Sequence, residues 1–206
     1  MTTSTDFDTR AATWDEDPVK HERAAAVAAG IRQRLALTAA TRVLDYGCGT
    51  GLLGLLLQPY VGPLTLADSS AGMLAVLKAK IAGAGLSDVH AVTLDLDSDP
   101  LPAERFDLIV TLMTLHHIAD TDRILRDFRS LLRAGGHLCV ADLDAEDGSF
   151  HGPDFNGHKG FDREALARRV RDAGFATVDF TTVYRMHKPT DHGQVEFPIF
   201  LMTAGR

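Results

Sequence analysis

The chain has 206 residues, a length typical of one domain with a single substantial core. Its formal net charge of −7 and its scattered lysines and arginines argue against a nucleic-acid-binding surface. The two cysteines form no disulfide framework, the polar N-terminus lacks the apolar segment of a signal peptide, and no apolar run is long enough to span a membrane. We therefore expect one cytoplasmic domain with no membrane partner.

The first half of the chain alternates helices with short apolar strands. Asp17 and Pro18 are typical of a helix N-cap and first turn, and they predict a helix that extends to about residue 37. Strands are predicted at residues 41–46, 63–68 and 89–96, and helices at residues 52–60 and 70–83, the latter capped by Ser70.

The second half continues this alternation and ends in a hairpin. Predicted strands at residues 106–113 and 137–143 flank a helix at residues 119–132, which Gly135 and Gly136 should close. Residues 144–160 lack periodicity and are a candidate functional loop, and Asp162 should cap a helix that extends to residue 173. Two last strands, at residues 175–184 and 196–203, should pair in antiparallel fashion across a polar loop. The alternation predicts an open α/β sheet.

The glycine-rich stretch after the first strand fits two fingerprints. Residues 49–54 read G-x-G-x-x-G, which is the turn of dinucleotide-binding proteins. Residues 45–51 also read acidic-x-Gly-x-Gly-x-Gly. Asp68 ends the second strand 17 residues after Gly51, where a carboxylate can accept both ribose hydroxyls. These features indicate an adenosine ligand in either case.

The charge of Asp45 separates the two readings. A dinucleotide brings a pyrophosphate to the first helix, whereas S-adenosylmethionine brings an ammonium and a sulfonium. Two unit charges about 5 Å apart, at an effective dielectric near 20, interact by roughly 3 kcal/mol. Asp45 lies directly before the loop, so it favours the cationic ligand. A nicotinamide-dependent oxidoreductase remains an alternative.

Six segments in order carry a resemblance to a known family: VLDYGCGTG, LADSSAGML, LDLDSDPLP, FDLIVTLMTLHHI, LLRAGGHLCVADL and FPIFLMTAGR. The chain resembles class I S-adenosylmethionine-dependent methyltransferases of the small-molecule type (methyltransferase domains 11 and 25). The resemblance implies an α/β fold, a Rossmann-like three-layer sandwich whose mostly parallel sheet has the order 3-2-1-4-5-7-6 with strand 7 antiparallel. It also implies one methyltransferase domain over residues 1–206, with an N-terminal lid and helix in residues 1–37 and a cofactor-binding core in residues 38–206.

The resemblance also implies a site for the cofactor S-adenosyl-L-methionine. Its expected contacts are Asp45, Gly47, Cys48, Gly49 and Gly51 at the methionine end, Asp68, Ser69 and Met73 around the ribose and adenine, Asp95 and Leu96 at the adenine, Thr111 and Leu112 over the cofactor, and Trp14 from the N-terminal lid.

The expected reaction is methyl transfer to a small organic acceptor. His116 and His117 follow the fourth strand and are candidates for a base or an acceptor contact. The carboxylates and histidines of residues 144–160 lack a legible family metal signature, so we expect a lid there and no metal. Strand 4 lacks the motif of enzymes that methylate nucleic-acid bases. A nucleic-acid or protein acceptor, or a catalytically silent cofactor-binding module, stays open, as does the oligomeric state.

Overall fold

The computed structural model describes residues 4–152, 154–190 and 193–206. Its helices are α1 (Ser4–Arg10), α2 (Pro18–Arg34), α3 (Leu52–Leu57), α4 (Ala71–Ala84), α5 (Thr121–Leu131) and α6 (Arg163–Asp172), with 3-10 turns η1 (Ala11–Glu16), η2 (Gln58–Tyr60) and η3 (Leu115–His117). Its strands are β1 (Val43–Tyr46), β2 (Leu64–Asp68), β3 (Val89–Thr93), β4 (Phe106–Leu112), β5 (Leu132–Leu143), β6 (Thr177–Thr190) and β7 (Gly193–Gly205).

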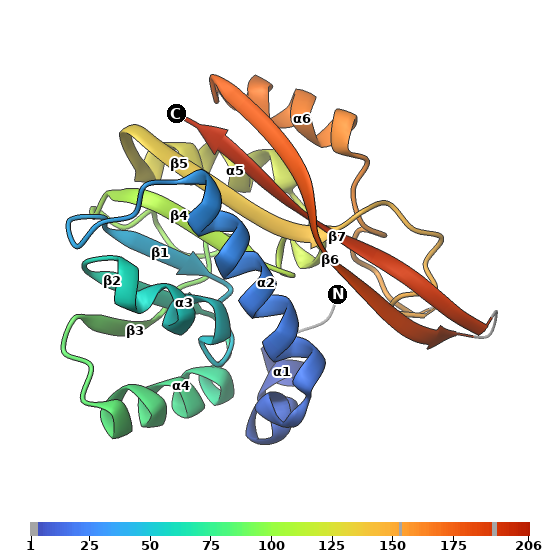
Figure 1. The fold of residues 1–206 in the computed structure, drawn as a ribbon, viewed down its shortest axis with the longest axis horizontal. Coiled ribbons are helices and arrows are strands. Elements are labelled where there is room, and N and C mark those ends of the chain that lie inside the picture. Colours follow the sequence, from blue (N-terminus) through green and yellow to red (C-terminus); the bar gives the residue numbers. More distant parts are fainter. Residues whose placement is uncertain (1–3, 153, 191–192) are drawn as a thin grey trace.

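The strands form one seven-stranded sheet in the order β3-β2-β1-β4-β5-β7-β6 (Figure 1). Strands β1 to β5 pair in parallel, and β7 lies antiparallel to both β5 and β6. The predicted topology is therefore confirmed. From β1 the chain continues to β2 and β3 on one side of the sheet, and then returns to place β4 and β5 on the other side of β1. The position between β1 and β4 is therefore a topological switch point, and ligands of open α/β sheets bind beside such a point.

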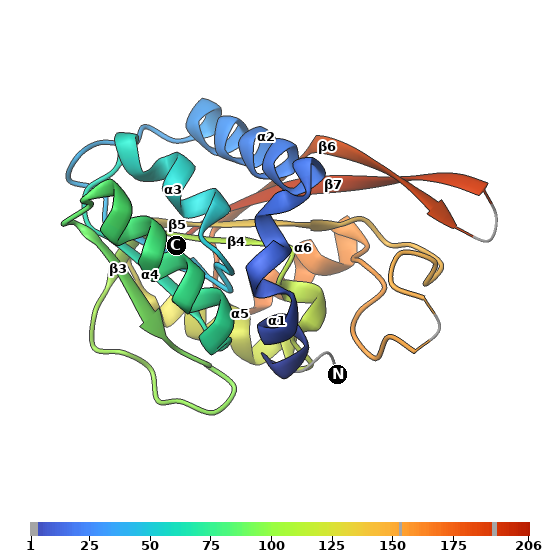
Figure 2. The same cartoon turned by 90° about the horizontal axis from the view of Figure 1, so that it is seen from below.

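Helices cover both faces of the sheet, which gives three layers (Figure 2). Apolar side chains of α2, α3 and α4 form one core cluster with one face of the sheet, including Ile31, Leu57 and Leu77. Side chains of α5 and α6 form a second cluster on the other face, including Phe128 and Val170. The central strands are buried on both faces, as their continuous apolar sequences predict.

Three helices begin at the predicted capping residues. The Asp17 carboxylate accepts a hydrogen bond from the N–H of Val19 at 3.0 Å, with Pro18 in the first turn of α2. The Ser70 hydroxyl accepts from the N–H of Met73 at 3.1 Å and so caps α4. Asp162 caps α6 in the same way. Local capping chemistry thus sets the start of each helix.

The helix predicted at residues 119–132 ends within one residue of the expected position, but Gly135 and Gly136 do not close it. Helix α5 ends at Leu131, and β5 begins at the next residue, because Leu132 pairs with Phe106 across a register shift in β4. Gly135 and Gly136 therefore lie within β5 and do not close the helix. Long-range strand pairing overrides the local helix signal here.

The C-terminal hairpin is longer than predicted. The polar residues that suggested a loop continue the ladder, with His187 paired to Glu196 and Lys188 paired to Val195. This extension projects beyond the helical layers (Figure 1), so its polar side chains reach solvent while Met186 and Phe197 are buried. Polarity alone could not distinguish an exposed two-stranded ribbon from a loop. The tip of the predicted loop, residues 191–192, lies outside the described residues.

No helix in the described residues is both long and apolar enough to cross a membrane.

Candidate functional site

A cavity of about 760 Å³ lies at the carboxyl ends of β1, β2 and β4, beside the switch point of the sheet. Most residues predicted for the site line it: Trp14, Asp45, Gly47, Cys48, Gly49, Asp68, Ser69, Met73, Asp95, Leu112, His116 and His117. The fold thus brings together residues that are up to about a hundred positions apart in the chain.

Three predicted contacts, Gly51, Leu96 and Thr111, lie outside the cavity lining. Leu96 and Thr111 are both buried, and Leu96 belongs to the core cluster beneath α5. Leu94, two residues earlier, lines the cavity, whereas Leu96 lies in the turn that follows β3 and packs into the core. Within β4, where neighbouring side chains point to opposite faces of the sheet, Leu112 lines the cavity and Thr111 lies behind it.

Two glycines of the loop, Gly49 and Gly51, differ in what they face. Gly49 has a positive φ of 55°, and a Cβ built on it would find its nearest atom, Met73 Sδ, 3.9 Å away. A ligand can therefore approach this backbone closely. Gly51 has a φ of 84° and precedes α3, and a Cβ there would lie 2.6 Å from Leu77 Cδ1. Gly51 therefore allows the loop to pack on α4 and makes no contact with the cavity.

Asp45 presents an unpaired carboxylate oxygen. The side chain is buried, and the Gly54 N–H donates to Oδ2 at 2.9 Å, while Oδ1 has no hydrogen-bond partner. Burial raises the pKa of Asp45 to about 7, although the hydrogen bond from Gly54 lowers it and the nearby Asp68 raises it. A buried acceptor without a donor is costly, so this oxygen suits a cationic ligand group.

Asp68 is held rigidly at the end of β2. The Gly49 N–H donates to one oxygen at 2.7 Å, and the Ser70 N–H donates to the other at 2.8 Å. Burial raises the pKa of Asp68 despite these hydrogen bonds. Each oxygen keeps a lone pair for a further donor, which fits a pair of ribose hydroxyls.

The N-terminal segment closes one side of the cavity and is tied to the glycine loop and to α4. Asp8 accepts hydrogen bonds from the Ser70 hydroxyl at 2.5 Å and from the Gly72 N–H at 2.7 Å. Asp15 accepts from the Thr50 hydroxyl at 2.6 Å and forms an ion pair with Lys80. These four interactions hold Trp14, which lies between Asp8 and Asp15 in the chain, over the cavity.

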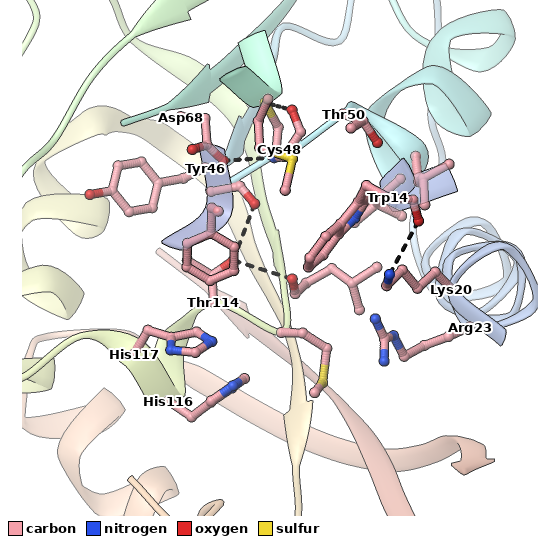
Figure 3. Close-up of a pocket in the computed structure, with 18 of the residues that line it drawn as sticks. Trp14, Lys20, Arg23, Tyr46, Cys48, Thr50, Asp68, Thr114, His116 and His117 are labelled. Carbon is pink, nitrogen blue, oxygen red and sulfur yellow. Dashed lines mark hydrogen bonds between the residues drawn. The ribbon is translucent and has the colours of Figure 1, made fainter. Parts of the chain in front are cut away.

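Two basic residues of α2 were missed in the sequence. The Lys20 ammonium lies 3.9 Å from the centroid of the Trp14 ring, and Arg23 lines the cavity beside Met186 (Figure 3). In the described part of the chain, no carboxylate lies within ion-pair distance of Arg23. Their i, i+3 spacing directly after the Asp17 cap places both on one helix face, which is the signal that could have revealed them.

A hydrogen-bonded turn connects β4 to the glycine loop. Met113 directly follows β4 and has a φ of 55°, a conformation rare for a residue with a side chain, and it lines the cavity. The Thr114 hydroxyl donates to the Gly47 carbonyl at 3.2 Å. This turn places the following histidines beside the cavity.

His116 is oriented by Asp142 at the end of β5. Asp142 Oδ1 lies 2.6 Å from His116 Nδ1, and the His116 backbone N–H donates to Oδ2 at 3.2 Å. Burial alone would raise the pKa of Asp142, but the attraction and hydrogen bonds of His116, together with the Leu143 N–H, lower it. Because Asp142 Oδ1 contacts Nδ1, the Nε2 atom is the ring nitrogen of His116 that is left for another partner.

Two further imidazoles surround His116. His117 lies with its ring centroid 4.1 Å away, and His151, from the candidate functional loop, lies at 5.0 Å. Burial, and secondarily the charge of His116, lowers the pKa of His117 to about 3 and that of His151 to about 4. Both rings are therefore neutral near pH 7 and can donate lone pairs. Figure 3 shows His116 and His117 across the cavity from Trp14 and Lys20.

The cavity thus has two chemically different ends. Carboxylates of Asp45, Asp68 and Asp95 lie at the glycine-loop end, where they suit ammonium, hydroxyl and amino donors. Imidazoles lie at the other end, and apolar side chains of Met113 and Phe150 also line the cavity. Such an arrangement can hold an adenosine ligand against a second molecule.

The methyltransferase domain family model matches residues 19–179 of the chain. A ubiquinone/menaquinone biosynthesis C-methyltransferase from Xanthomonas oryzae is 31% identical over 121 residues, which cover 57% of this chain and 48% of that protein. A methyltransferase from Schizosaccharomyces pombe, described as uncharacterized, is 29% identical over 153 residues, or 66% of this chain and 54% of that protein. The chain spans about half the length of these curated relatives.

Solved structures show the same fold. A chain of the Haloferax volcanii complex that contains the Trm112 methyltransferase activator has a TM-score of 0.77 at 19% identity, covering 97% of this chain and 96% of that chain. Phosphoethanolamine N-methyltransferase 2 from Haemonchus contortus, in complex with S-adenosyl-L-methionine, has a TM-score of 0.71 at 15% identity, covering 87% and 52%. With the family match over most of its length, the chain belongs to the class I S-adenosylmethionine-dependent methyltransferases.

Proposed function

We propose that this protein transfers a methyl group from S-adenosylmethionine to a small organic acceptor, and that the cavity holds both molecules. The observation that carries the proposal is the pairing of an unsatisfied buried carboxylate oxygen at one end with lone-pair imidazoles at the other. The bound cofactor supplies a methyl group on a sulfonium, and displacement at that carbon needs an aligned nucleophile.

At the glycine-loop end, each polar group has a complementary group in the cofactor. Asp45 accepts from the methionine ammonium, Asp68 accepts from the ribose hydroxyls, and Asp95 accepts from the adenine amino group. Leu94 and Met73 supply apolar contacts to the adenine in place of Leu96. These assignments follow from the donors and acceptors that remain free at each position.

Arg23 binds a carboxylate. Its guanidinium is partly buried in the lining and lacks an ion-pair partner in the described residues, so it is free for a planar anion. The carboxylate belongs either to the methionine part of the cofactor or to the acceptor. Comparing the binding of S-adenosylhomocysteine, which has the methionine carboxylate, with that of methylthioadenosine, which lacks it, distinguishes the two sources.

At the imidazole end, the acceptor lies beside His116 and His117. A neutral imidazole can accept a proton from the acceptor as its nucleophilic atom attacks. Phe7 and Phe150 line the same region, so the acceptor has an apolar part. The contact of Nδ1 with Asp142 leaves Nε2 of His116 as the nitrogen that faces away from that carboxylate.

Three observations support a small acceptor over a polymer. The N-terminal segment covers the cavity and is held there through Asp8 and Asp15. The net charge of −7 opposes nucleic-acid binding. The Xanthomonas oryzae relative is named for C-methylation in ubiquinone and menaquinone biosynthesis, which concerns small organic compounds.

Two experiments test the proposal. Titration with S-adenosylhomocysteine should show one site per chain. If Arg23 binds the methionine carboxylate, Arg23→Met should lower the affinity for S-adenosylhomocysteine and leave the affinity for methylthioadenosine unchanged. If neither ligand is affected, the carboxylate belongs to the acceptor. In cell extract, a labelled methyl group should enter the low-molecular-weight fraction. Label confined to protein or nucleic acid would refute the small acceptor.

A further inference from the structure

Three histidine side chains converge at the acceptor end of the cavity. His116 and His117 come from η3, and His151 comes from the loop between β5 and α6. Each offers one ring nitrogen, and these atoms all lie within 4.8 Å of one another. All three residues line the cavity.

Two of these imidazoles carry a buried nitrogen without a partner. His116 Nε2 and His117 Nδ1 are inaccessible to solvent and form no hydrogen bond with any residue that the structure describes. The His116 side chain is only 1% exposed. Leaving such an atom unsatisfied costs about 1–3 kcal/mol, so a missing ligand is a natural explanation for a pair of them. A single cation could satisfy both nitrogens.

The surroundings of His116 match those of a metal-binding histidine. Metal-binding histidines usually donate their second ring N–H to a carboxylate, which fixes the tautomer and strengthens the ligand. Asp142 is in this position, with its oxygen 2.6 Å from Nδ1. The carboxylate is completely buried and is held by the N–H groups of Leu143 and His116, so it stays in place when the ring binds a ligand.

We propose that His116, His117 and His151 bind a divalent transition-metal ion, with Asp142 as the carboxylate that orients His116. Three imidazoles and no first-sphere carboxylate favour Zn²⁺ or a chemically similar ion over Mg²⁺ and Ca²⁺, which prefer oxygen ligands. This proposal replaces the expectation, drawn from the sequence, that the site holds no metal.

The observed spacing needs only a small adjustment. Zn–N bonds of about 2.0–2.1 Å in a tetrahedral site put neighbouring nitrogens about 3.4 Å apart, so the rings would move closer by roughly 1 Å. His151 can supply most of this movement because it lies on a loop and its side chain is half-buried. Its ring stacks on Phe155 with centroids 3.9 Å apart, which leaves it free to slide in the ring plane.

A metal with three histidine ligands keeps a fourth position for another ligand. Because the histidines line the cavity, that position is available to the acceptor. With the metal bound, the imidazoles would act as its ligands in place of the base role proposed above. An acceptor thiol or hydroxyl bound to the metal would lose its proton to solvent and attack the methyl carbon, while the C–S⁺ bond breaks to leave a neutral thioether. This consequence rests on the proposed function, whereas metal binding itself does not.

The test is equilibrium binding of Zn²⁺ to protein freed of metal with a chelator. We expect one tight site per chain and, with Co²⁺ in its place, the visible absorption typical of tetrahedral coordination. Asp142→Asn should weaken Zn²⁺ binding about 10–100-fold. His151→Ala should weaken it further without changing the circular dichroism spectrum. His187→Ala is the matched control, since this exposed imidazole lies outside the cluster and its loss should leave Zn²⁺ affinity unchanged.

Absence of a tight site in the wild-type protein would overturn the proposal. So would equal Zn²⁺ affinity in the wild-type protein and His151→Ala, since the metal would then bind elsewhere. Asp142 is buried at the end of β5, so Asp142→Asn could destabilise the fold. If that variant fails to fold, His151→Ala alone provides the test. Titration of the same samples with S-adenosylhomocysteine separates the two proposals, because cofactor binding without Zn²⁺ binding refutes only the metal site.

Discussion

The substitution Asp45→Asn tests the central feature of the cofactor site. It preserves the size of the side chain and the acceptor oxygen that takes the Gly54 N–H, but it removes the negative charge. The change therefore removes the group proposed to bind the methionine ammonium and leaves the packing around β1 intact. Its effect should depend on pH, because the pKa of Asp45 is raised to about 7 by burial.

The size of the effect follows from that pKa. Only the ionised carboxylate attracts the ammonium, and with a pKa near 7 about one tenth of it is ionised at pH 6 and about nine tenths at pH 8. Wild-type affinity for S-adenosylhomocysteine should thus rise about tenfold over this interval, and Asp45→Asn should lack the rise. At pH 8 the lost charge-assisted hydrogen bond, about 1.5–3 kcal/mol, corresponds to a roughly 10–150-fold weaker Kd.

The ligand-free protein should respond in the opposite direction. The pKa of Asp45 is higher in the folded protein than the ordinary 3.8, so the protonated carboxyl stabilises the fold at low pH. This stabilisation is lost as the pH rises from about 4 to 7. Above pH 7 the ionised carboxylate lowers the free energy of unfolding by about 4 kcal/mol, which corresponds to the whole rise in pKa from 3.8 to about 7. Asp45→Asn should therefore raise the free energy of unfolding at pH 8 and change it little at pH 4.

Isothermal titration and urea denaturation measure both effects. Methylthioadenosine is the control ligand, since it has the adenosine part without the ammonium, and Asp45→Asn should bind it as the wild-type protein does. The ammonium of the ligand titrates identically with both proteins and cancels in their Kd ratio. The role of Asp45 would be refuted if the variant lost affinity for both ligands equally, or if its affinity for S-adenosylhomocysteine kept the pH dependence of the wild-type protein.

Three further predictions concern other parts of the cavity. Asp68→Ala should weaken S-adenosylhomocysteine and methylthioadenosine alike, by about 1.5–3 kcal/mol in titrations, and unchanged affinity would count against its ribose role. His116→Asn and His117→Asn, made separately, should each lower kcat about 10²-fold or more while changing the Kd of S-adenosylhomocysteine little; if neither changes turnover, the histidines are structural. Asp15→Ala releases the N-terminal lid from Thr50, so S-adenosylhomocysteine should dissociate faster in stopped-flow measurements. The free energy of unfolding should change by only about 1 kcal/mol. An unchanged dissociation rate would argue against the lid.

The sequence predicted the features that depend on local patterns. Continuous apolar runs predicted the parallel strands, and Asp17, Ser70 and Asp162 predicted the helix starts, because capping involves neighbouring backbone groups. The positions of Asp45 and Asp68 followed from the rule that loops at the carboxyl ends of parallel strands share one edge of the sheet. The glycine loop could therefore be placed beside both carboxylates before any contact was known.

Features that depend on side-chain direction or on distant segments needed the structure. Leu96 and Thr111 are each next to a lining residue in the chain, but both side chains are buried. The alternation along β4 turns Thr111 away from the cavity, and Leu96 lies in the turn after β3. The hairpin extension required knowing that the ribbon is exposed, because polar residues then no longer indicate a loop.

The sequence by itself determined the fold class, the family resemblance and the set of glycines and carboxylates that we propose bind adenosine. Those conclusions rest on periodicity and on spacing within single loops. The tertiary structure alone brought His151 to His116, left Asp142 to orient that ring, and put Arg23 into the lining. These residues lie on separate elements, so their proximity is set by how the loop and α2 pack on the sheet, which no local pattern encodes.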